Sequence, residues 1–427
     1  MSLKISKKKL NIVFVALLMF APSLLRGLVV NYNAPISISV IGYTVLCLLI
    51  IAALTTSNSK KTKTFKITII GIMLLLGISG INFVRGDYTV TQYFQGLLTY
   101  FHFFVFYIVA AVLLNKKSFD KISRTIILII GIDAIAILYQ FFFLGLKQDK
   151  LGGLFGNANG CNGIQNTFSC IGLILVTVWY LDRKCKLSQM ILYCAVTAVM
   201  AGLAEITMYF FEMLIIIVFA VLLNANKKMT VKEISRILAF LLLFVFVFYV
   251  GVRVLFLLFP TKVRFLQVSA ILEYLGGKNG GTGVYKISRL HAVSQMKELF
   301  LNNSLDSAIG MGIGSTGVSS TFYRSYSNLQ YNWFSSATTM LETGFIGVIF
   351  KMLFFGYIFW KAQSYKKINN PELNEMCSIS QLVVIYAVIM FFYNNTLENI
   401  YDSYLIAGFL ASFLIGLKEY GRAKYDS

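Results

Sequence analysis

The stretch YFQGLLTYFHFFVFYIVAAVLL, residues 93–114, contains no Asp, Glu, Lys or Arg. A helix that crosses about 30 Å of hydrocarbon needs about 20 mostly apolar residues, and this stretch is long enough. Similar runs recur along the chain, and we predict about twelve spans near 10–28, 35–55, 67–84, 93–114, 125–146, 162–181, 189–204, 207–224, 237–259, 341–360, 377–395 and 402–417. Because the apolar runs are continuous rather than alternating, they predict an all-α polytopic membrane bundle and exclude a transmembrane barrel.

The composition is typical of a protein that folds in a bilayer. The 427 residues are 57% hydrophobic and 13% charged, with a mean hydropathy of +0.73 and a net charge of +20. A soluble protein carries roughly a quarter charged residues, so these values exclude a water-soluble enzyme, a disordered protein and a coiled coil. The chain contains no polar domain that could carry the positive charge to DNA or RNA. We therefore expect membrane lipids, and no nucleic acid, among its partners.

The positions of Lys and Arg predict the orientation. With a cytoplasmic N-terminus, the inner segments hold 25 of these cations, whereas the short outer loops hold only Arg26, Arg85, Lys147 and Lys150. Cytoplasmic loops of membrane proteins are enriched in Lys and Arg, so we expect both termini in the cytoplasm. Most of the net charge therefore reflects topology rather than a substrate.

One outer loop, 261–340, is much longer than a connection between bundled helices requires. It divides the predicted transmembrane region 1–260 from a second one at 341–427. Seven Lys or Arg against three Asp or Glu give the loop a net charge of 7 − 3 = +4. Long loops cross the membrane regardless of charge, so the surplus indicates an anionic ligand such as a lipid phosphate or diphosphate. An ordinary loop that rests on anionic head groups is the alternative.

The loop contains a predicted short amphipathic helix at 288–300. Its apolar residues recur at helical spacing, namely Leu290, Val293, Met296 and Phe300. Ser288 is placed to cap the helix, and Arg289 is predicted in its first turn. We expect the apolar face to lie on the bundle at the outer interface. Exposed backbone N–H groups and a guanidinium that grips phosphate oxygens make Arg289 a candidate anion-binding residue.

Two further stretches are rich in glycine. Residues 310–317, GMGIGSTG, lack the Gly-Lys-Ser/Thr of a Walker loop, so they favour close backbone approach to another helix over phosphate binding. Residues 151–163, LGGLFGNANGCNG, set three asparagines among glycines. These asparagines are either turn formers or groups that hydrogen-bond sugar hydroxyls, and the residues alone favour neither interpretation.

Three motifs together resemble the O-antigen ligase and polymerase family of bacterial membrane glycosyltransferases. GLFGNAN at 153–159 resembles its G-x-F-x-N-x-N turn. Ser288-Arg289, followed by GMGIG at 310–314, looks like its loop arginine and following glycine motif, and ETGFIG at 342–347 is similar to its E-x-G-x-x-G. The motifs occur in the family's order across 151–347, and the predicted spans cover the rest of the chain.

The resemblance implies a multi-pass enzyme of the bacterial plasma (inner) membrane without a metal or cofactor. Such an enzyme transfers a glycan from an undecaprenyl diphosphate carrier onto a hydroxyl of an acceptor. The acceptor is another lipid-linked repeat unit in a polymerase and a lipid A core sugar in a ligase. The implied partners are an undecaprenyl-diphosphate-linked oligosaccharide, membrane lipids, and the chain-length regulator and flippase of the same pathway.

The resemblance also assigns candidate site residues. Arg289 would neutralise the diphosphate leaving group, and a base would take the proton of the acceptor hydroxyl. His291 and Glu342 are the candidate bases. The candidate substrate-binding residues are Arg264 and Arg324, chosen by position alone, with Asn157, Asn159 and Asn332.

The chain departs from the family pattern at two places, and the first departure, a missing histidine, favours a polymerase over a ligase. Ligases usually place a histidine shortly before E-x-G-x-x-G, where this chain reads Tyr331-Asn332-Trp333-Phe334. The Ser-Arg pair that often starts the eighth span is replaced by Thr207-Met208. His102 lies in the fourth span, and we expect a structural role for it.

Charged residues within predicted spans are the last signal. Such charges are costly and usually face a partner or a wet cavity, so we expect a structural pair such as Asp133 with Lys351. A transporter whose pathway these charges line is the alternative from another functional class. That alternative predicts an inverted repeat with interrupted spans, and the sequence contains neither. The cysteines form no C-x-x-C and the outer loops contain no D-x-D, so we expect no metal site.

Overall fold

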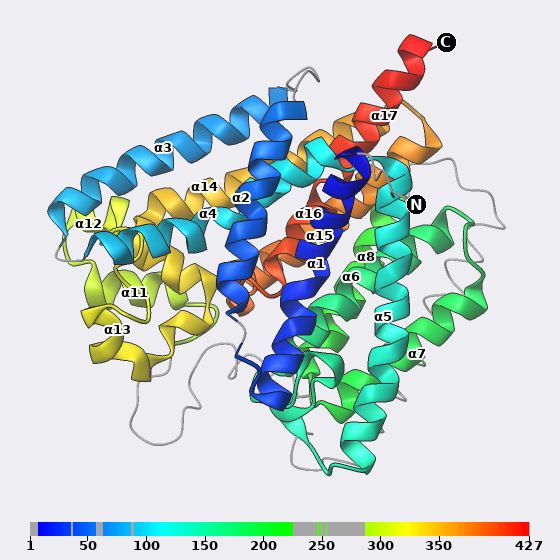
Figure 1. Ribbon diagram of the computed structural model, residues 1–427, viewed down its shortest axis with the longest axis horizontal. Coiled ribbons are helices and arrows are strands. Elements are labelled where there is room, and N and C mark those ends of the chain that lie inside the picture. The colour runs from blue at the N-terminus through cyan, green and yellow to red at the C-terminus, as the bar shows by residue number, and fades with distance from the viewer. Residues whose placement is uncertain are drawn as a thin grey trace, which may run out of the picture.

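The computed structural model describes residues 7–35, 37–56, 63–86, 89–224 and 287–426, together with Phe246, Tyr249 and Arg253. Every regular element in these ranges is a helix (Figure 1). Eight of the described helices are long and apolar enough to cross a membrane: α1 (Lys7–Tyr32), α3 (Lys63–Arg85), α4 (Val90–Leu113), α5 (Lys116–Phe142), α6 (Cys161–Leu181), α8 (Thr207–Asn224), α14 (Ser335–Lys366) and α15 (Pro371–Tyr393). The prediction of an all-helical fold is confirmed for the described residues, and the length and composition of these eight helices support a polytopic membrane protein.

The remaining predicted spans differ in length from these helices. Two shorter apolar helices coincide with the predicted spans 35–55 and 189–204: α2 (Ile38–Thr56) and α7 (Leu187–Leu203). The last predicted span, 402–417, is divided into α16 (Ser403–Leu410) and α17 (Ser412–Asp426). Apart from the three single residues named above, the predicted ninth span at 237–259 lies outside the described residues.

A tight turn at Glu205 and Ile206 joins α7 to α8. Glu205 takes the left-handed conformation with a φ of 55°, and the Ile206 amide donates to the carbonyl of Ala201 at 2.8 Å. A backward bond of this kind satisfies one of the carbonyls that a helix leaves open at its end.

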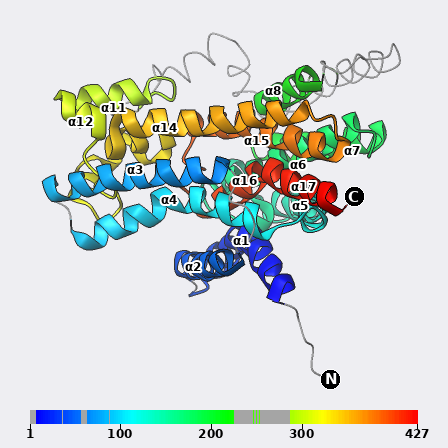
Figure 2. The same ribbon diagram turned by 90° about the horizontal axis from the view of Figure 1, so that it is seen from above.

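The described part of the long loop and the chain termini lie at opposite ends of the bundle. Three short helices, α11 (Ala292–Phe300), α12 (Ser304–Ile309) and α13 (Thr321–Tyr326), gather at one end of α3, α4 and α14 (Figure 1). Both labelled termini lie toward the other end, which a view turned by 90° also shows (Figure 2). Which end faces the cytoplasm is a prediction from the distribution of Lys and Arg.

The glycine and asparagine turn before α6 is held by polar side chains of α5. The amide of Leu154 donates to Asp133 Oδ1 at 2.7 Å, and Gln140 bonds both the amide and the carbonyl of Gly153, at 2.8 and 2.9 Å. Gly153 has a φ of 56°, where a side chain would be strained. The predicted pair of Asp133 with Lys351 is therefore wrong: Asp133 positions this turn, because its amide donors lie beside α5.

Candidate functional site

Arg289 lies in the turn that precedes α11. The helix begins at Ala292 with His291 as its N-cap, and the His291 amide lies 3.4 Å from the Ser288 hydroxyl that accepts from it. Ser288 therefore caps the turn rather than the helix, and the prediction that Arg289 lies in the first helical turn is wrong. The amphipathic character is confirmed, because Ala292 and Met296 are buried and α11 packs against α14.

Two aromatic rings position the Arg289 guanidinium. Its Cζ lies 5.5 Å from the ring centroid of Phe334 and 4.8 Å from that of Tyr393. Phe334 directly precedes α14 and Tyr393 is the last residue of α15. These two helix ends are joined by a 2.9 Å bond from the Ser335 amide to the Asn394 carbonyl. Cation–π contacts orient the half-buried cation at this junction.

Glu342 lies at a kink of α14 that the glycine-rich segment covers. Gly344 breaks the helix with a φ of 60°, so the carbonyls of Leu341 and Glu342 turn to partners outside it. The Met311 amide donates to Leu341 at 2.7 Å and the Gly312 amide donates to Glu342 at 3.0 Å. In an unbroken helix these carbonyls would accept from residues four positions further on. The kink thus joins the two motifs, 310–314 and 342–347, into one folded unit.

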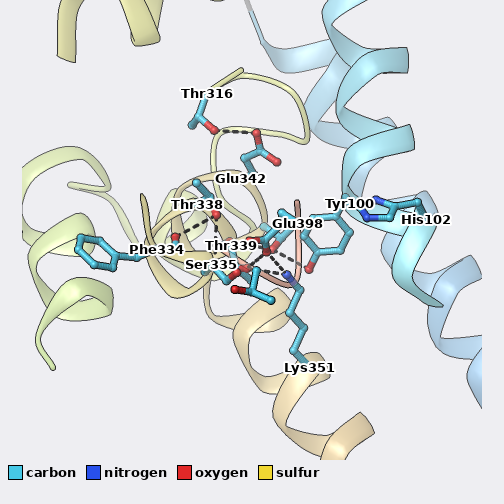
Figure 3. Close-up of polar contacts among 12 residues, drawn as sticks. Tyr100, His102, Thr316, Phe334, Ser335, Thr338, Thr339, Glu342, Lys351 and Glu398 are labelled. Atoms are coloured by element: carbon cyan, nitrogen blue, oxygen red, sulfur yellow. Dashed lines mark hydrogen bonds and ion pairs between the residues drawn. The ribbon is translucent and has the colours of Figure 1, made fainter. Parts of the chain in front are cut away.

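The side chain of Glu342 is also bonded. The Thr316 hydroxyl donates to its carboxylate at 2.7 Å (Figure 3). The Tyr331 hydroxyl donates to the Thr316 carbonyl at 2.8 Å. Burial raises the pKa of the Tyr331 phenol, so it remains a donor at neutral pH.

The alternating glycines allow backbones to approach closely. At Gly310, with a φ of 73°, a Cβ atom would lie 2.5 Å from the Thr343 amide nitrogen. At Gly314, with a φ of 88°, a Cβ atom would overlap the Gln92 carbonyl of α4. The backbone of Gly96, one turn further along α4, also lies close to this position. The prediction of close approach between this segment and another helix is confirmed.

Replacing Gly314 with Ala should lower the thermal unfolding midpoint of the detergent-solubilised protein. The left-handed conformation alone costs a non-glycine residue about 1–3 kcal/mol, and the overlap with α4 adds to it. Gly317→Ala is the matched control, because a Cβ there would meet only the Gly314 carbonyl, at 3.4 Å. Equal midpoints for the two variants, measured with a thiol-reactive dye, would show that the approach to α4 does not require glycine.

A buried ion pair lies further along α14. Lys351 Nζ is 2.5 Å from Glu398 Oε1 and 2.8 Å from Thr339 Oγ1, and it lies 4.5 Å from the ring centroid of Tyr100 (Figure 3). The side chains of Lys351 and Glu398 are only 4% and 14% exposed. Tyr100 is itself bonded to Thr343, one residue before the kink, at 3.3 Å. The pair therefore borders the unit that contains Glu342.

Sequence reasoning missed Glu398. It lies in 394–402, NNTLENIYD, a polar stretch between α15 and α16. A carboxylate in a short polar stretch between two apolar runs is a signal that could have been noticed. The identity of its partner could not, because Lys351 lies on a different helix.

The other predicted site residues are distributed over three places. The Asn332 carbonyl accepts from Asn395 at 3.0 Å, so Asn332 lies beside the junction of α14 and α15. Arg324 is exposed on α13, and His291 is exposed at the start of α11. Asn157 and Asn159 follow η2 (Gly153–Phe155), which packs against α1, α5 and α6 rather than against α14. Arg264 lies outside the described residues.

His102 has a structural role, as expected. It is 2% exposed, its Nε2 lies 2.7 Å from the Ser403 hydroxyl, and its Nδ1 lies 3.1 Å from the Leu98 carbonyl. In the described ranges, no three side chains of His, Cys, Asp or Glu are grouped closely enough to hold a metal ion.

The described residues thus place three groups along α14: a cation on two aromatic rings at its start, a carboxylate at its kink and a buried ion pair at Lys351. The cation is suited to bind an anionic group, and a carboxylate is suited to accept a proton or hydrogen-bond a hydroxyl. No protein-family model matches the chain, and no curated protein matches it.

Proposed function

We propose that this chain is an O-antigen or capsular polysaccharide polymerase, a glycosyltransferase of the bacterial plasma membrane. In this proposal twelve helices span the membrane, both termini are cytoplasmic, and 261–340 forms an outer loop. The chain would extend a glycan by transferring it from undecaprenyl diphosphate to a lipid-linked repeat unit. A ligase that transfers to lipid A core is the alternative within the same chemistry.

The observation that best supports the proposal is the placement of Arg289. Its guanidinium is held at the junction of α14 and α15, and α14 is also the helix that bears Glu342. The diphosphate gains charge as the glycosidic C–O bond breaks, and a fixed cation stabilises that charge more in the transition state than in the ground state. The two motifs that resemble the family, separated along the chain, are bonded to each other here.

In the proposed step, the acceptor hydroxyl oxygen attacks the anomeric carbon of the donor sugar. The bond from that carbon to the diphosphate oxygen breaks, and undecaprenyl diphosphate leaves with the electron pair next to Arg289. The hydroxyl proton passes to a base, for which Glu342 and His291 are the candidates. Asn332, beside the junction, would hydrogen-bond the sugars, while Arg324 and Arg264 would assist in binding the diphosphate.

The proposal is tested with the purified full-length protein in lipid nanodiscs. Incubation with an undecaprenyl-diphosphate-linked repeat unit should produce a ladder of longer lipid-linked glycans on a gel, and the reaction without protein should produce none. Transfer only to added lipid A core would indicate the ligase instead. Unchanged substrate that crosses the membrane of a protein-containing vesicle would contradict both and indicate a transporter.

A further inference from the structure

A cavity of about 480 Å³ lies beside the glycine-rich segment 310–317, which contributes Gly310, Met311 and Ser315 to its lining. Its volume falls within the roughly 300–1,000 Å³ that is usual for small-molecule sites. The lining residues that matter come from α3, α4, α12 and the segment 310–322: Asn82, Arg85, Gln92, Asp306, Ser315 and Phe322. We propose that this cavity binds the uncharged, hydroxyl-rich part of a glycan.

Two polar atoms at the cavity are buried without a partner. Asn82 is 2% exposed, and its amide nitrogen donates to the Ile309 carbonyl at 2.6 Å while its Oδ1 accepts no bond. The Ser315 hydroxyl is likewise buried and unbonded. Buried polar groups normally have partners, and leaving one unsatisfied is costly. Both atoms are closed off in this conformation, but their residues line the cavity, and rotation of the Ser315 side chain would present its hydroxyl to a ligand that offers hydroxyl groups, as sugars do.

The charges at the cavity favour a neutral ligand over an anion. Arg85 is paired with Asp306 at 3.0 Å, so its charge is balanced. The two side chains are 40% and 29% exposed, which leaves donors and acceptors open to a ligand. An anion would meet the Asp306 carboxylate, which repels it. Hydroxyl groups can donate to this carboxylate and accept from Arg85.

An apolar wall completes the chemistry. Met311 and Phe322 line the same cavity, and Phe322 is fixed edge-on to Tyr331, with ring centroids 5.2 Å apart. A fixed aromatic face suits the C–H face of a sugar ring, while the polar groups across the cavity suit its hydroxyls. A lipid chain would leave those polar groups unsatisfied.

The position of the cavity suggests which glycan it holds. Met311 and Ser315 line it, and they belong to the segment whose Met311 amide bonds to Leu341 and whose Thr316 bonds to Glu342. A glycan in the cavity would therefore end close to Glu342. We assign the glycan in the cavity as the acceptor chain, and this assignment rests on the proposed polymerase function. The proposal that the cavity binds a glycan does not depend on that function.

The test measures binding rather than transfer. The full-length protein in nanodiscs is applied to an array of short uncharged oligosaccharides that lack lipid and phosphate. The wild-type protein should bind at least one of them. Ser315→Ala should weaken that binding about five- to tenfold, the value of one hydrogen bond, without lowering the thermal unfolding midpoint, because it removes an unbonded buried hydroxyl. Thr321→Trp, which places a bulky ring in the cavity wall, should abolish binding.

Ser79→Ala is the matched control. Ser79 lies on α3 with Asn82, is 2% exposed and has an equally unbonded hydroxyl, but it does not line the cavity. It should leave binding unchanged. The proposal would be overturned if the wild-type protein bound no oligosaccharide, or if Ser315→Ala and Thr321→Trp bound as tightly as the wild-type protein. Either result would count against it even if ladders form. Binding with the expected pattern but without ladder formation would instead overturn the polymerase function.

Discussion

Alanine at position 289 should abolish ladder formation, with a loss of at least about a hundredfold in the rate of glycan transfer. Removing one preorganised group that stabilises charge in a transition state typically costs about 10²–10³ in rate. Arg289 is the described loop cation that is held against the junction of α14 and α15, so its loss would leave the departing diphosphate without that charge. The rate is measured from ladder intensity over time with the purified variant in nanodiscs.

Two further variants define what Arg289 contributes. Arg289→Lys keeps the charge but loses the planar fork that grips two phosphate oxygens, so it should restore only a small part of the rate. Lys297→Ala removes an exposed cation from α11, the helix that follows the Arg289 turn, and should leave the rate unchanged. The lost contacts to Phe334 and Tyr393 are each worth about 0.5–2 kcal/mol, so the Ala variant should still fold. Chain growth at the wild-type rate in folded Arg289→Ala would sink the assignment.

Breaking the Lys351–Glu398 pair from either side should destabilise the protein strongly. Removing one partner of a buried pair leaves the other charge uncompensated, which typically costs about 3–5 kcal/mol. In Lys351→Met, the Glu398 carboxylate keeps only the Thr339 hydroxyl, at 3.3 Å, and its Oε2 already has no partner. We expect a clearly lower unfolding midpoint, measured by thermal unfolding in detergent and by titration with SDS.

The double variant Lys351→Met/Glu398→Gln separates charge from packing. Because it removes both charges while keeping similar volumes, it should recover most of the stability that either single variant loses. Lys367→Met, the same substitution at an exposed position directly after α14, should change the midpoint little. A double variant as unstable as Lys351→Met would show that the pair is not what stabilises this part of α14.

Local patterns predicted the parts of the fold that depend on neighbouring residues. The apolar runs predicted the long helices, because burial in hydrocarbon requires a continuous apolar segment whatever lies beside it. The spacing of apolar residues after Arg289 predicted an amphipathic helix that packs on the bundle. Helix limits were less well predicted: α14 begins at Ser335, ahead of the expected start at 341, and α11 begins at Ala292.

Partners that come from distant parts of the chain could not be predicted in this way. Asp133 and Lys351 were expected to pair because both are charged and lie within apolar runs. The packing of the helices instead places the amide of Leu154 next to Asp133 and brings Glu398 to Lys351. The sequence records that a buried charge needs a partner, but it does not record which helices are adjacent.

The same division holds for the candidate site. Composition, apolar periodicity and charge bias were enough to predict an all-α membrane protein and to select Arg289, and the resemblance of short motifs to a known family selected Glu342, because these signals are local. Only the folded chain bonds 310–312 to the α14 kink, places Arg289 between Phe334 and Tyr393, and forms the cavity beside Ser315. Those arrangements depend on which backbones can approach each other closely, and that is decided by tertiary packing around Gly96, Gly310 and Gly314.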